Sequence, residues 1–173
     1  SHNGPVCDGE DIILTTSTPG STFEWIGPGV DAMGNFNPAD PAVNSGTIQL
    51  QVTYTEGTCV YTENLSVVIN EKPSSDFTVD SPICIDEPSM IRYTGATTGV
   101  AFDWDFNDGT GGIAGGTQNI EWTTSGSKTV TLTTSKDGCF SDETIMTVEV
   151  DDPLQTPMIF CVFNQNSISF DWA

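Results

Sequence analysis

Cysteine is the residue of this chain best able to form a covalent link, and its five copies recur in a regular pattern. Cys7, Cys84 and Cys161 are equally spaced, and Cys59 and Cys139 follow the first two of them after similar intervals. None belongs to a C-x-x-C motif, which disfavours zinc-ribbon and thioredoxin-like sites. The pattern predicts a repeated unit with one disulfide per copy, Cys7 with Cys59 and Cys84 with Cys139. Cys161 then begins a third unit and is unpaired.

The alternative to this disulfide framework is a cytosolic protein with five reduced, buried cysteines. We favour the oxidised form, because closing a loop of about 50 residues stabilises a small domain by roughly 4 kcal/mol. An oxidising compartment outside the cytoplasm follows from that preference.

Carboxylates are the second group that could do chemistry. Asp103, Asp105 and Asp108 crowd one expected strand and its following turn, and Asp151 and Asp152 stand together in a later linker. Ca²⁺ takes about six to eight oxygen ligands, so both clusters are candidate calcium sites. In the alternative, which we favour, Asp108 caps its turn and the other carboxylates are solvated.

The charge balance excludes several classes of function. The chain has 24 acidic and 4 basic side chains and a net charge of −20. Such a surface repels nucleic acid and anionic membranes, and no apolar run is long enough to insert into a bilayer. The single histidine, His2, lies in a segment typical of a tag remnant, so histidine-based catalysis and metal binding are not expected. We therefore expect a non-catalytic module rather than an enzyme.

Strands rather than helices must position these residues. The chain is rich in Gly and Pro, with 17 and 10 copies, and contains no stretch of helical periodicity. Residues 47–54 alternate polar and apolar side chains, with Leu50 and Val52 on the apolar face, and residues 129–133 alternate in the same way around Val130 and Leu132. A period of two is typical of half-buried strands, so we predict an all-β fold of antiparallel sandwiches.

Aromatic residues repeat in step with the cysteines. Phe-Glu-Trp at 23–25 matches Phe-Asp-Trp at 102–104, which predicts that Trp25 and Trp104 fill equivalent cores. Alternation in 102–106 places Phe106 on the face of Trp104 and the aspartates on the other. Trp122 is expected to be a core residue as well.

Polar, proline-containing segments at 70–75 and 151–157 divide the chain. We expect a tag or linker remnant at 1–4, a first sandwich at 5–72, a second at 73–152, and a linker with the first strand or strands of a truncated third module at 153–173. Residues 167–172 alternate like a strand without a partner of their own. Because the linkers are short, neighbouring modules should touch and form a semi-rigid array.

The second unit resembles the PKD domain family. Residues 104–109, Trp-Asp-Phe-Asn-Asp-Gly, are similar to its W-D-F-G-D-G signature, and residues 125–132 are similar to the strand that follows. The sequence departs from the family at Asn107, usually Gly, and at Lys128, usually aromatic. The resemblance implies an Ig-like sandwich with Trp104, Phe106 and Gly109 as core signature, and the first unit looks like a divergent sister built around Trp25.

Arrays of this kind are similar to the large secreted surface adhesins of gliding bacteria, which implies cell-surface attachment or gliding and export by a type IX system. Expected partners are neighbouring sandwich modules of the same chain, together with surface polysaccharide or another protein. The alternative is an accessory carbohydrate-binding or spacer region of a secreted hydrolase.

Overall fold

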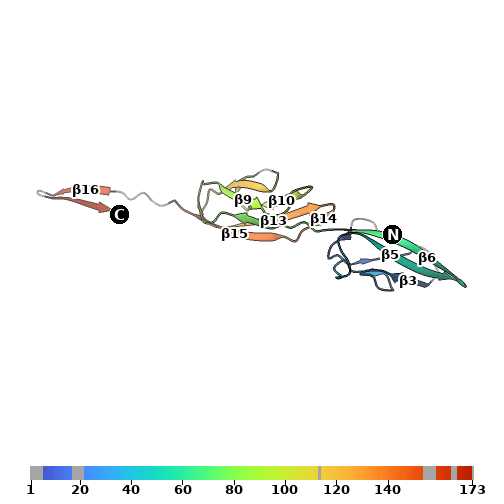
Figure 1. Ribbon diagram of the computed structural model, residues 1–173. Helices are drawn as coiled ribbons and strands as arrows, with labels where there is room; N and C mark the ends of the chain where they lie inside the picture. Colours follow the sequence, from blue (N-terminus) through green and yellow to red (C-terminus); the bar gives the residue numbers. More distant parts are fainter. Residues whose placement is uncertain (1–5, 17–21, 113, 154–158, 165–166, 173) are drawn as a thin grey trace.

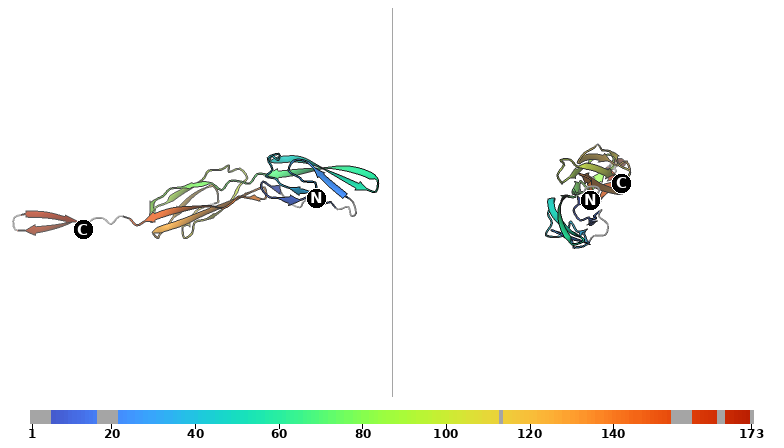
Figure 2. Two further views of the ribbon diagram at one scale, coloured as in Figure 1. Left: turned by 90° about the horizontal axis from the view of Figure 1, so that it is seen from below. Right: turned by 90° about the vertical axis from the view of Figure 1, so that its right-hand side faces the viewer.

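The structure, a computed structural model, describes residues 6–16, 22–112, 114–153, 159–164 and 167–172. Side chains are described up to residue 153. The described part consists of strands and connecting turns, with no helix among them that could span a membrane. Two β-sandwiches lie end to end, with the first at the right of Figure 1 and the second at its centre, and the view from below agrees (Figure 2).

The first module is built from strands β1 to β6. A four-stranded sheet has the order β1-β6-β5-β3, and β2 and β4 form a second, two-stranded sheet. The strand bounds are β1 Val6–Cys7, β2 Ile12–Ile13, β3 Thr22–Ile26, β4 Asn35–Phe36, β5 Gly46–Glu56 and β6 Cys59–Asn70.

The second module is built from strands β7 to β15. One sheet has the order β10-β13-β15-β8, with β14 also paired to β13, and the facing sheet has the order β11-β12-β9-β7. The strand bounds are β7 Phe77–Val79, β8 Ile83–Cys84, β9 Ser89–Tyr93, β10 Ala101–Asp105, β11 Thr110–Gly111, β12 Thr117–Glu121, β13 Gly126–Lys136, β14 Cys139–Phe140 and β15 Thr144–Asp151.

Each module encloses its own apolar core. The predicted alternation is confirmed: Leu50 and Val52 are buried on β5, and Val130 and Leu132 on β13. Trp122 is fully buried, as expected. Buried residues of the first core are Val6, Leu14, Trp25, Phe36, Leu50, Val52, Val67 and Ile69. Those of the second are Phe77, Ile91, Ile120, Trp122, Val130, Leu132, Val148 and Val150.

One strand pair in each module is parallel, within sheets that are otherwise antiparallel. Strand β1 lies parallel to the end of β6, with Cys7 opposite Asn70. Strand β8 lies parallel to the end of β15, with Cys84 opposite Asp151. The first cysteine of each module is therefore held at the end where the last strand leaves that module.

The C-terminal segment has a strand partner, which corrects the sequence-based expectation. Strand β17, Ser167–Trp172, pairs antiparallel with β16, Ile159–Asn164. The partner was missed because residues 159–163 are continuously apolar and lack the alternation used to find strands. Cys161 lies in β16, and its side chain is outside the described residues.

Candidate functional site

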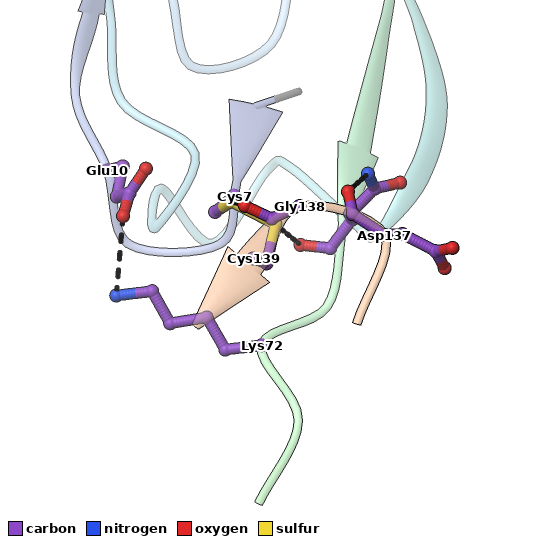
Figure 3. Close-up of a disulfide and its surroundings, with 7 residues drawn as sticks. Cys7, Glu10, Lys72, Asp137, Gly138 and Cys139 are labelled. Atoms are coloured by element: carbon purple, nitrogen blue, oxygen red, sulfur yellow. Dashed lines mark hydrogen bonds and ion pairs between the residues drawn. A yellow bond between two sulfur atoms is a disulfide. The ribbon is translucent and has the colours of Figure 1, made fainter. Parts of the chain in front are cut away.

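The joint between the two modules holds the only disulfide among the described residues. Cys7 of β1 is bonded to Cys139 of β14, with an S–S distance of 2.03 Å and a Cα–Cα distance of 5.6 Å (Figure 3). Their Cα separation is within the usual range for disulfides. The bond links residues 132 positions apart and crosses from one sandwich to the other.

Local structure brings both cysteines to the joint. Cys7 is carried there by the parallel pairing of β1 with the end of β6. Cys139 is the first residue after the turn between β13 and β14, opposite Lys136. Asp137 and Gly138 form that turn with φ values of 50° and 83°. Glycine and aspartate tolerate this left-handed region better than most residues, so the hairpin can close tightly.

The predicted disulfides, Cys7–Cys59 and Cys84–Cys139, are wrong. Cys59 and Cys84 are free thiols, exposed and half-buried respectively. Cys59 begins β6, and Cys7 lies beside its last residue, Asn70, 12 residues along an extended strand. At about 3.3 Å per residue the two cysteines are roughly 35 Å apart, far beyond disulfide range.

The same distance argument applies to the second module. Cys84 lies beside the end of β15, where Val150 pairs with Gly126 at the start of β13. Cys139 lies opposite Lys136 at the other end of this 11-residue strand. Each module thus carries its two cysteines at opposite ends, and the two that meet belong to different modules.

Polar contacts surround the disulfide. Asn70 donates a side-chain hydrogen bond to the backbone carbonyl of Asp137, with a distance of 3.0 Å. The ammonium of Lys72 lies 3.9 Å from the carboxylate of Glu10 (Figure 3). This ion pair connects the linker to the first module. It is largely exposed, so its contribution to stability is small.

The linker is anchored to both modules. Glu71 accepts a hydrogen bond from Ser45 of the first module at 2.9 Å. The carbonyl of Ser74 accepts bonds from Tyr93 at 2.9 Å and from Thr134 at 2.7 Å in the second module. Because the linker is hydrogen-bonded on both sides of the joint, the modules have little freedom to move relative to each other.

Tyr93 connects this anchor to an acidic neighbour. Burial of its phenol, together with the negative charge of Asp76, raises the pKa of Tyr93. Asp76 also accepts a hydrogen bond from the hydroxyl of Ser74 at 2.7 Å. The phenol therefore stays protonated and donates to the linker at any ordinary pH.

A solvent-open groove of about 400 Å³ lies at the joint and has walls from both modules. Its lining includes Lys72 and Lys136, two of the four basic side chains of the chain, and the carboxylates of Glu71 and Asp137. With charges of both signs along its walls, the groove selects for neither anions nor cations.

The proposed calcium ligands are not gathered into a site. No group of three or more His, Cys, Asp or Glu side chains in the described part of the chain is arranged to hold a metal ion. Asp103 and Asp105 lie on the exposed face of β10, and Asp105 accepts a hydrogen bond from the backbone of Asn107 at 2.8 Å. Asp151 and Asp152 are exposed at the far end of the second module.

Asp108 is engaged by a cation of the protein itself. The ammonium of Lys128 lies 2.8 Å from its carboxylate, and Thr124 donates to the same oxygen at 2.9 Å. These hydrogen bonds, from Lys128 first, lower the pKa of Asp108. Lys128 is buried on β13, and the ammonium at the end of its aliphatic stem reaches Asp108.

The residues of the expected core signature lie in or against the two cores. Trp25 is 6% exposed in the first core, and Trp104 and Phe106 pack against the second. At Gly109 a Cβ atom would stand 2.5 Å from Ile120, which explains why this position is glycine. Asn107 adopts a φ of 59°, in the left-handed region that asparagine tolerates better than most residues.

The chain matches no protein-family model and no curated protein sequence. Among solved structures it is similar to the I-band fragment I67-I69 from titin, with 11% identity and a TM-score of 0.43, covering 88% of this chain and 65% of that one. It is also similar to extracellular domains 3-5 of Drosophila OTK, with 16% identity and a TM-score of 0.42, covering 84% of this chain and 57% of that one.

A third similar structure is the surface layer protein SbsC, domains 4-9, with 18% identity and a TM-score of 0.30, covering 87% of this chain and 25% of that one. At these identities and TM-scores the likenesses carry no argument about activity or partners. The expected all-β fold of tandem sandwiches is confirmed by the sheets of the described residues, although the disulfide joins the modules instead of lying within each.

Proposed function

We propose that this chain is a non-catalytic part of an extracellular, multi-domain surface protein, in which it acts as an adhesin or stalk repeat in cell-surface attachment or gliding. The observation that carries the proposal is the Cys7–Cys139 disulfide across the joint. Disulfides persist mainly in oxidising compartments, which supports a location outside the cell. A covalent link between adjacent modules suits a protein whose task is to hold its parts in a fixed order and direction.

The surroundings of the disulfide support the same function. The linker is hydrogen-bonded to both modules, through Ser45 on one side and Tyr93 and Thr134 on the other. A net charge of −20 keeps an extended array soluble and disfavours self-association. The PKD-like segment 104–109 and the comparison with gliding-bacterial adhesins motivate the more specific assignment to attachment or gliding and to type IX export.

Small-angle X-ray scattering tests the stalk. The full chain is expected to give the narrow pair-distance distribution of a rod under oxidising conditions, and the double variant Cys7→Ala/Cys139→Ala a broader one. The matched control, Cys59→Ala/Cys84→Ala, leaves the disulfide intact and should scatter like the original chain. A broad distribution for the unaltered, oxidised chain would show that the modules are not fixed and would contradict the stalk.

Attachment is tested in the cell that makes the protein. Removing the codons for residues 6–151 in frame should reduce the number of cells that attach to or glide on a surface. A deletion mutant that still exports the protein and attaches as well as its parent would contradict the adhesive role.

A specific observation favours carbohydrate binding as the second candidate. Phe23, Tyr54 and Tyr61 form an aromatic row across β3, β5 and β6, with ring centroids 5.9 Å and 5.1 Å apart. Tyr61 is 44% exposed. Aromatic rings on a sheet surface can stack on sugar rings, which makes this row a candidate site for surface polysaccharide.

Pull-down with insoluble polysaccharides tests this candidate. If it is correct, Tyr61→Ala should lower retention at least severalfold, whereas Val60→Ala, at a neighbouring exposed position, should not. Equal retention of the two variants would leave the aromatic row without a role in glycan binding.

A further inference from the structure

Cys84 occupies the position in the second module that Cys7 occupies in the first. Both cysteines end a two-residue strand that lies parallel to the last strand of their module. Cys7 stands opposite Asn70, and Cys84 stands opposite Asp151. Since Asn70 and Asp151 are the last residues of β6 and β15, both cysteines face the end where the chain leaves the module.

The backbone around the two cysteines is also the same. In each module the chain turns back directly after the cysteine, with a residue in the left-handed region two positions later, Gly9 at 78° and Asp86 at 60°. The matching hydrogen bonds are Asp8 N to Asn70 O at 3.0 Å and Glu10 N to Cys7 O at 3.1 Å, against Ile85 N to Asp151 O at 3.0 Å and Glu87 N to Cys84 O at 3.2 Å. The geometry that presents Cys7 to a neighbour is therefore repeated at Cys84.

The partner position is repeated as well. Cys139 follows the turn of its hairpin and stands opposite Lys136, and Cys59 follows the turn between β5 and β6 and stands opposite Glu56. Each module thus has two cysteines at opposite ends. One lies at what we call the leading end, where the last strand leaves the module, and the other lies at the hairpin end, directly after the hairpin turn. Among the four described cysteine side chains only Cys7 and Cys139 meet, because only they flank the joint.

The two free thiols are more exposed than the two bonded cysteines, as expected if each lacks a neighbouring module that would cover it. Cys7, bonded to the next module, is 3% exposed, and Cys139 is fully buried. Cys84 is half-buried and Cys59 is exposed. The hairpin end of the first module also carries the partly exposed Tyr54, at the place where β13 of the second module has the buried Thr134 bonded to the linker.

We propose that Cys84 forms a disulfide with the hairpin cysteine of a following module of this type, and that Cys59 accepts the leading cysteine of a preceding one. The partner is another sandwich of the same kind, joined as the two modules here are joined. The inference rests on the proposed function as a repeat of a longer stalk. It predicts an array in which each joint carries one disulfide and no module has a disulfide of its own.

Formation of this bond requires an oxidant, which is another disulfide such as oxidised glutathione. The Cys84 thiolate attacks one sulfur of the oxidant and releases one thiol. The thiolate of the hairpin cysteine then attacks the Cys84 sulfur in the mixed disulfide and releases the second thiol. Two cysteine thiols lose two electrons and two protons, and the oxidant becomes two thiols.

One contact of the existing joint would not be repeated. Asn70 donates its amide to the turn carbonyl of Asp137 at 3.0 Å, and its counterpart Asp151 has a carboxylate that cannot donate. Replacing Asp151 with Asn would restore the donor and is expected to raise the yield of the Cys84 disulfide.

A fused chain tests the proposal directly. Residues 1–151 are followed by a second copy of residues 71–151, which places the appended Cys139 relative to Cys84 as Cys139 stands to Cys7. After oxidation in a glutathione buffer, alkylation and digestion without reduction, peptide mapping should find Cys7–Cys139 and Cys84 bonded to the appended Cys139. Cys59 and the appended Cys84 should be alkylated.

Control variants make the result specific. In the fused chain Cys84→Ser should leave the appended Cys139 alkylated, whereas Cys59→Ser should change nothing. A folded appended module, with Cys84 still alkylated while Cys7–Cys139 has formed, would overturn the proposal. That outcome would leave the stalk itself standing, because scattering from the unaltered chain tests it separately.

A second measurement uses the full chain and does not depend on the folding of an appended module. At high protein concentration, the Cys161→Ser chain is oxidised so that Cys59 and Cys84 of different copies can pair. Random pairing of two thiols cannot place more than half of the bonds in the mixed Cys84–Cys59 pair. Docking of a leading end on a hairpin end should place well over half there, and a share of half or less would overturn the proposal.

Discussion

The two modules share an arrangement of strands but differ in how completely they bury their own apolar side chains. In the second, sheets of four or more strands face each other over a core that includes the fully buried Trp122. In the first, a four-stranded sheet faces only β2 and β4 among the described strands. Of the eight exposed large apolar side chains among the described residues, six belong to the first module, namely Ile13, Ile26, Met33, Val60, Tyr61 and Val68, against Phe140 and Ile145 in the second.

Modules that repeat in sequence can therefore differ in how much of their apolar surface they bury by themselves. The second module buries its hairpin end against the linker, through Thr134 and Tyr93. The first carries partly exposed aromatic residues, Phe23, Tyr54 and Tyr61, at its own hairpin end. The environment of a module therefore depends on its neighbour as well as on its own sequence.

The largest expected effect comes from emptying the two cores. Trp122→Ala should destabilise the second module by about 3–5 kcal/mol, because it opens a cavity and removes a hydrogen bond of 3.1 Å to the carbonyl of Phe106. The matched change Trp25→Ala should cost the first module less, since that side chain is 6% exposed. Hydrogen exchange resolved by module measures both effects, and equal losses would contradict the difference in packing.

Removing the disulfide should make the less stable module unfold at a lower urea concentration. When one module unfolds while the other stays folded, the bond closes a loop of nearly 70 residues, which is worth about 4 kcal/mol in the loop-entropy model. Cys7→Ala/Cys139→Ala should therefore lower the first urea transition by about that amount. Cys59→Ala/Cys84→Ala is the control and should shift it little, whereas an equal shift in both double variants would mean that the disulfide lies elsewhere.

The close packing at Gly109 gives a smaller effect. A Cβ atom there would meet Ile120 at 2.5 Å and the indole nitrogen of Trp122 at 2.8 Å. Gly109→Ala should therefore destabilise the second module by about 1–3 kcal/mol through overpacking and leave the first unchanged. Thermal unfolding measures this, and an unchanged transition temperature would show that the strand β12 moves without cost.

The smallest expected effect is a difference between the modules in how their stability depends on pH and salt. The pKa of Asp108 is lowered by hydrogen bonds from Lys128 and Thr124, and that of Asp31 by hydrogen bonds from Asn35. Both carboxylates contribute stability above their unfolded pKa, and both contributions disappear as the pH falls through the folded pKa.

Salt should distinguish the two carboxylates, because Asp108 faces a charged ammonium and Asp31 a neutral amide. Asp108→Asn should reduce the salt dependence of stability between neutral and mildly acidic pH, and Asp31→Asn should not. Titration of unfolding at low and high salt is the measurement. The same salt response in both variants would count against a role for the Lys128 charge.

Much of the fold follows from local patterns, whereas the pairing of the cysteines does not. Alternation around Leu50 and Val130 identifies the long central strands because one face of each is buried. The equal spacing of Cys7, Cys84 and Cys161 does not distinguish a disulfide within each repeat from one between adjacent repeats, and β1 is too short to reveal its parallel partner. One signal was present: a strand that runs the whole length of the module places Cys59 far from the joint.

The candidate site was likewise predicted only in part. The linker at 70–75 was located from its composition, but its fixation needs contacts such as Thr134 to Ser74, which are 60 residues apart. The sequence favours solvated or turn-capping aspartates near residue 105 over calcium ligands, but it does not reveal that Lys128 reaches Asp108.

The position of the disulfide has a consequence for how the chain transmits tension. A pull applied before Cys7 and after Asp151 would pass through the sulfur–sulfur bond to Cys139 and reach only β14 and β15, bypassing the chain between the two cysteines. That chain spans 132 positions, so at about 3.3–3.6 Å per residue the bond withholds roughly 440–475 Å of contour length. The first module and most of the second would carry no load, and they could unfold and refold without lengthening the molecule.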